Sequence, residues 1–110
     1  MIKSTSHGTE LTVFLSGEID HCTAQQIREE IEALWASGDA RHLILDFSHV
    51  SFMDSSGVGM IIGRYKTVSS MGGTVSATGL HPTIDRLFRM AGLHRILHIV
   101  ENTDREENKR

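Results

Sequence analysis

The chain alternates short apolar runs with longer amphipathic stretches, and this order constrains its fold more than any other feature of the sequence. Residues 10–16 alternate apolar and polar side chains with a period of two, which indicates a strand with one buried face. Residues 41–47 form a nearly continuous apolar run, which favours a strand covered on both faces. Three further strands are predicted at residues 2–6, 74–77 and 96–100.

Three segments between these strands space their apolar residues as an amphipathic helix does. The first is predicted to begin with a capping box of Thr23 and Gln26. The second follows residues 54–57, and the third begins at Pro82, whose missing N–H would have no helical partner there. The predicted buried faces comprise Ala24, Ile27, Ile31, Leu34 and Trp35; Val58, Ile61, Ile62, Tyr65 and Val68; and Ile84, Leu87, Phe88 and Ala91.

This order of elements predicts the fold class. Strands that alternate with helices through short loops give an α/β domain with a mixed, mostly parallel sheet and right-handed βα units. A chain of 110 residues forms a single domain. We expect that domain to span residues 1–101, followed by a tail at 102–110 that has no apolar residue to dock it and frays.

Composition excludes several classes of function. The formal net charge of −3 gives no basic face for direct binding of nucleic acid. The single cysteine cannot form an internal disulfide, and no apolar run approaches the length of a membrane span. We therefore expect a soluble cytoplasmic protein, a monomer when free, that needs no cofactor. Its seven histidines are interpreted as surface residues and not as a metal site.

Residues 52–59 join the end of a predicted strand to the start of a helix, where ligands and partners tend to meet an open α/β sheet. A phosphate on Ser55 would be stabilised there by the free N–H groups and the macrodipole of the helix. Gly57 and Gly59 would let a partner's backbone approach. The alternative is that the two serines are simple N-caps. Asp54 is interpreted as a recognition or capping residue.

From residue 15 to about residue 100 the chain resembles the STAS-domain family of anti-sigma-factor antagonists, and within it the sporulation anti-anti-sigma factors. The resemblance implies that an anti-sigma factor, an ATP-dependent serine kinase, phosphorylates Ser55. The unphosphorylated protein would bind the kinase, in its ATP- or ADP-bound state, and free the sigma factor; a PP2C-type phosphatase would restore this form. The matching residues are 15–21, 23–24, 41–42, 50–59, 62–66, 82, 86–88, 90 and 92–93.

The resemblance also implies a partner surface and leaves rivals open. It assigns no catalytic residue to the chain, so we expect a kinase substrate and not an enzyme. One rival is a STAS scaffold subunit of a larger signalling assembly, and another is a small serine hydrolase or nucleotide-binding enzyme. His81 stands where the relatives have a serine, which would weaken the cap of the third helix. The implied partner-binding residues are Asp20, His21, Asp54, Ser55, Ser56, Gly57, Val58 and Gly59.

Overall fold

Five strands and three α-helices alternate along residues 2–100, the part of the chain that the computed structural model describes. The predicted tail at 102–110 lies outside these residues. The elements are β1 (Lys3–His7), β2 (Glu10–Ile19), α1 (His21–Ala36), β3 (His42–Met53), α2 (Ser55–Ser70), β4 (Thr74–Thr78), α3 (Pro82–Met90), a 3₁₀ turn η1 (Leu93–Arg95) and β5 (His98–Val100).

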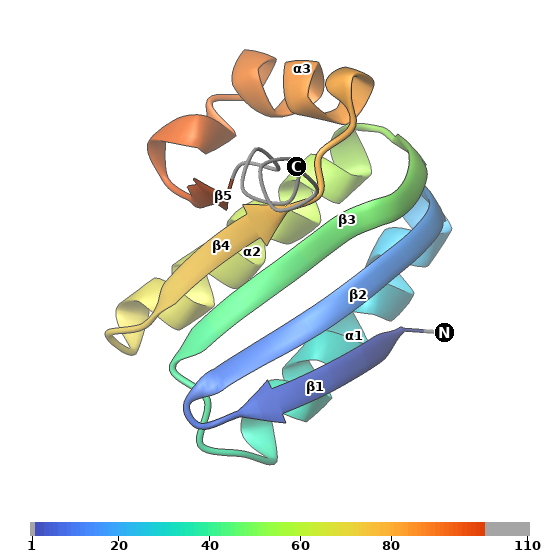
Figure 1. Ribbon diagram of the computed structural model, residues 1–110. Coiled ribbons are helices and arrows are strands. Elements are labelled where there is room, and N and C mark those ends of the chain that lie inside the picture. The colour runs from blue at the N-terminus through green and yellow to red at the C-terminus, as the bar shows by residue number, and fades with distance from the viewer. Residues whose placement is uncertain (1, 101–110) are drawn as a thin grey trace, which may run out of the picture.

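The strands form one sheet in the order β1-β2-β3-β4-β5. β1 pairs with β2 antiparallel, and every other neighbouring pair is parallel. Figure 1 shows α1 and α2 side by side on the far side of this sheet, so the two crossovers that contain them have the same, right-handed sense. The predicted α/β class with a mixed, mostly parallel sheet is confirmed.

The core lies between the sheet and its helices. Leu11, Val13 and Leu15 of β2 are all buried, which confirms the predicted alternation in this strand. Phe47 of β3 packs edge-on against Phe88 of α3, with ring centroids 5.3 Å apart. Among the predicted helix residues, Leu34, Trp35, Val58, Ile62, Tyr65 and Leu87 are only partly buried against the core, while Ala91 is exposed.

β3 corrects two predictions. It was expected to have both faces covered, but Ile44 and Asp46 on its second face are only half-buried, and no described helix covers that face. It was also expected to end at residue 47, yet it continues to Met53. Two register shifts against β2 change the spacing of its buried residues from two to three, as in Phe47, Val50 and Met53, and hide the strand periodicity.

Two helix starts also differ in detail from the prediction. α1 begins three residues earlier than expected, because Asp20 and not Thr23 is its N-cap. Thr23 instead completes the capping box: its hydroxyl accepts from the backbone N–H of Asp20 at 2.8 Å. α3 begins at Pro82 as predicted, and its N-cap His81 makes no side-chain cap hydrogen bond. No helix in residues 2–100 is long and apolar enough to cross a membrane.

Candidate functional site

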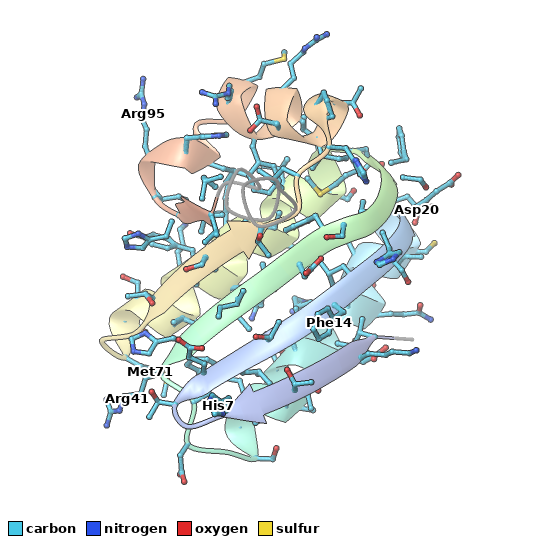
Figure 2. The ribbon with its side chains drawn as sticks, in the orientation of Figure 1. His7, Phe14, Asp20, Arg41, Met71 and Arg95 are labelled. Atoms are coloured by element: carbon cyan, nitrogen blue, oxygen red, sulfur yellow. The ribbon has the colours of Figure 1, made fainter. Side chains whose placement is uncertain are left out.

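The turns that follow β2 and β3 lie next to each other at the carboxyl edge of the sheet. Ile19 and Met53, the last residues of these strands, are paired in register. One residue further on, the backbone N–H of Asp54 donates to the carbonyl oxygen of Ile19 at 3.2 Å. The structure therefore brings together the two segments that sequence reasoning singled out, residues 20–21 and 54–59. Figure 2 shows Asp20 at this edge of the sheet.

Each turn ends in an aspartate that caps the next helix. The Asp54 carboxylate accepts from the backbone N–H of Ser56 at 2.8 Å. The Asp20 carboxylate accepts from the N–H groups of Cys22 and Thr23, both at 3.0 Å. These donors, led by Thr23, hold the pKa of Asp20 below its ordinary value. Both carboxylates therefore serve as N-caps, and Asp54 is confirmed as a capping residue.

Ser55 is the first residue of α2 and its side chain is exposed. Since Asp54 provides the cap, the alternative that the serines are N-caps is wrong. Among the described residues 2–100, the Ser55 hydroxyl makes no hydrogen bond to another residue. Ser56 follows it, half-buried, with its N–H already bound by Asp54.

The two glycines of this turn have different roles. A Cβ at Gly57 would lie 2.4 Å from Cγ of Met53 and 3.0 Å from Cγ2 of Ile19. Gly57 is buried against the ends of β2 and β3, so the expectation that it admits a partner's backbone is wrong. A Cβ at Gly59 would have no neighbour within 4 Å, which leaves this exposed position open. Val58, between them, is half-buried.

A shallow groove of about 330 Å³ runs between the first turns of α1 and α2, beside Ser56. α1 lines it with His21, Gln25 and Arg28, and α2 with Ser56 and Gly59. Sequence reasoning missed Gln25 and Arg28. Their spacing of four and seven from His21 places all three side chains on one side of the helix, and this was the available signal.

Phe52 is a second residue that sequence reasoning left out of the site. It lies two positions before Asp54 and is 50% exposed, although it is a large apolar side chain. It precedes buried Met53 in β3 and so lies on the opposite face of the strand, and the predicted strand ended at residue 47, before this position.

Three histidines make their contacts elsewhere in the fold. The ring of His42 contacts the Thr74 hydroxyl, that of His81 the Ser48 carbonyl oxygen, and that of His94 the Asp85 carboxylate. Within residues 2–100 no three His, Cys, Asp or Glu side chains are grouped to hold a metal ion.

Comparison with known proteins adds the following. The family model of the STAS domain matches residues 1–106. An anti-sigma F factor antagonist from Paenibacillus polymyxa is 37% identical over 101 residues, which cover 92% of this chain and 86% of the relative. The solved structure of the anti-sigma factor antagonist SpoIIAA in its unphosphorylated form is 27% identical, with a TM-score of 0.74, and covers 100% of this chain and 96% of that one. The phosphorylated form of SpoIIAA, a Bacillus cell fate determinant, is 27% identical with a TM-score of 0.72, and each chain is covered completely.

Proposed function

The chain belongs to the STAS domain family, and on this premise we propose that it is an anti-sigma factor antagonist whose switch is the phosphorylation of Ser55. Its unphosphorylated form binds an anti-sigma factor that is also an ATP-dependent serine kinase, and so releases a sigma factor. The kinase then phosphorylates Ser55 and ends the binding. A PP2C-type phosphatase restores the active form. Support comes from relatives named as antagonists and from a neighbour solved in both phosphorylation states.

The observation that carries the proposal is the position of Ser55. Its hydroxyl is exposed at the first residue of a 16-residue helix, while the adjacent Asp54 provides the cap. A phosphate there meets the positive end of the helix macrodipole and displaces no hydrogen bond of the cap. Phosphorylation therefore leaves the fold intact, and its effect is on the surface that meets the partner.

That surface comprises the two turns and the groove between the helices. Asp20, His21, Ser56 and Gly59 lie around Ser55, and Asp54 already places one negative charge beside it. A phosphate adds about 1.5 to 2 further negative charges. A mismatched charge in a buried interface costs about 2–5 kcal/mol. This lowers affinity by a factor of about 30 or more, because 1.4 kcal/mol corresponds to tenfold.

The proposal includes the state of the free protein. We infer that it is a cytoplasmic monomer that acts as a substrate and binding partner, and that it performs no catalysis itself. Incubation of the purified chain with ATP and simple esters, without a partner, addresses the last point. Turnover that disappears in Ser55→Ala would contradict it.

The test is a phosphorylation assay with a sporulation-type anti-sigma kinase and ATP, followed by mass spectrometry to locate the phosphate. We expect one phosphate on Ser55, none in Ser55→Ala, and normal labelling in the matched control Ser56→Ala. If labelling is lost in Ser56→Ala but not in Ser55→Ala, Ser56 is the phosphorylated residue and our assignment of the switch to Ser55 is wrong. No labelling by a kinase shown to be active on another antagonist would favour a scaffold role in a larger assembly.

A further inference from the structure

A small cavity lies between α1 and α2, on the side of the sheet that these helices cover (Figure 1). Its volume is about 230 Å³, which is the space that about eight water molecules occupy in the liquid. The cavity therefore has room for a small organic molecule of about eight non-hydrogen atoms. Most of its wall is apolar and includes Ile31 and Trp35 of α1, Leu43 of β3 and Val68 of α2.

One charged side chain forms part of this wall. Arg64 of α2 lines the cavity, and its side chain is only 8% exposed. Its Nη1 donates to the Glu32 carboxylate at 2.8 Å, while the Glu32 side chain remains 47% exposed. The positive member of the pair is therefore buried, whereas the negative member is largely solvated. Removing a guanidinium from water is costly unless its donors find acceptors.

The donors of Arg64 are not all used. Its Nε is buried and has no hydrogen-bond partner within residues 2–100. Glu32 contacts Nη1 alone, so the N–H of the solvent-inaccessible Nε has no acceptor among the described residues. Arginine presents its N–H groups as a planar fork, which matches the two oxygens of a carboxylate.

We propose that this cavity is a binding site for a small apolar monocarboxylate. The alkyl or aryl body of the ligand packs against Trp35, Leu43 and Val68, and its carboxylate accepts hydrogen bonds from the Arg64 guanidinium. A carboxylate is favoured over a neutral acceptor because charge-assisted hydrogen bonds to arginine are stronger than neutral ones. An amine of the same size is disfavoured by the positive charge of Arg64.

The site is independent of the proposed phosphorylation switch. Arg64 lies nine residues after Ser55 in α2, which is roughly 13 Å along a helix that rises 1.5 Å per residue. No residue that lines the cavity is part of the surface around Ser55. Failure of one proposal therefore leaves the other standing.

Trp35 provides the readout, because it lines the cavity and is the only tryptophan in the chain. The full chain is titrated with hexanoate at constant ionic strength while Trp35 emission is recorded. We expect a saturable change with one site per chain, and a much weaker response to hexanamide and hexylamine. No saturable change with hexanoate, or equal binding of hexanamide, would overturn the proposal.

Two variants test the role of Arg64. Arg64→Met keeps an apolar side chain of similar length, and half-exposed Glu32 can be hydrated without its partner, so we expect the fold to survive. Hexanoate should bind this variant at least about tenfold more weakly, which is the effect of losing a hydrogen bond to a charged group. Unchanged affinity in folded Arg64→Met would refute the site.

Glu32→Gln is the matched control, and we expect it to change the affinity for hexanoate in the direction opposite to Arg64→Met. It preserves the shape of the side chain but removes the carboxylate that competes for Arg64. We expect hexanoate to bind this variant more tightly than the original chain. If Arg64→Met does not fold, as judged by circular dichroism, Glu32→Gln decides alone: tighter binding supports the site, and equal or weaker binding rejects it.

Discussion

Gly57 and Gly59 make a matched pair for testing how tightly the switch turn is packed. Both lie near the start of α2, but a Cβ at Gly57 would come within 2.4 Å of Cγ and 2.7 Å of Sδ of Met53, whereas one at Gly59 would meet nothing within 4 Å. Alanine at either position should stabilise the helix by about 0.5–1 kcal/mol relative to glycine. At Gly57 the added methyl must also displace Met53, and overpacking of this kind costs about 1–3 kcal/mol.

The helix-propensity gain is common to both variants, so their difference isolates the packing cost. We predict that Gly59→Ala raises the free energy of unfolding by about 0.5–1 kcal/mol and that Gly57→Ala lies about 1–3 kcal/mol below it. Urea denaturation followed by circular dichroism measures both values. Equal stability of the two variants would show that the buried contact of Gly57 does not fix the position of this turn, and the packing argument would be refuted.

Three further predictions concern single side chains. Asp54→Ala removes the N-cap of α2 and should lower the free energy of unfolding by about 0.5–2 kcal/mol, whereas Asp54→Asn, which keeps an acceptor, should cost less; denaturant unfolding distinguishes them. A hydrogen bond from Arg89, and a weaker one from His94, hold the pKa of Asp85 below its ordinary value. The stability that the lowered pKa of Asp85 provides should be complete above about pH 4 and lost as the pH falls through the lowered pKa. Asp85→Asn should lack this part of the acid-induced loss of stability. If the denaturation midpoints of the original chain and of Asp85→Asn depend on pH in the same way, this prediction is contradicted. Ser55→Asp should melt within about 2 °C of the original chain, since an exposed surface change is worth at most about 0.5 kcal/mol; a much lower melting temperature would contradict the surface-only mechanism.

The element order was predictable from the sequence because periodicity reports burial directly. Residues 10–16 alternate without interruption, and the structure places them in β2 with one face buried. β3 was predicted too short because its register shifts break the two-residue period after Phe47. The start of α1 was misplaced because both Asp20 and Thr23 are good capping residues. Each accepts from the backbone N–H of the other, and only the structure shows that Asp20, with its extended backbone, is the N-cap.

The site was predictable in its location and less so in its details. The strand-to-helix position of residues 54–59 follows from local patterns, and the adjacency of Asp20 follows from parallel strands that end at one edge. The burial of Gly57 depends on Met53 and Ile19, which come from two strands, and therefore could not be inferred locally. The burial of Arg64 is likewise a product of tertiary packing, since a charged residue on a helix is ordinarily expected at the surface.

The central claim is that a phosphate on Ser55 removes partner binding without unfolding the protein. Isothermal titration of the anti-sigma kinase with the unphosphorylated chain and with the chain phosphorylated on Ser55 tests it most directly. We predict a dissociation constant at least about 30-fold higher for the phosphorylated form. Equal dissociation constants for the two forms would contradict the claim.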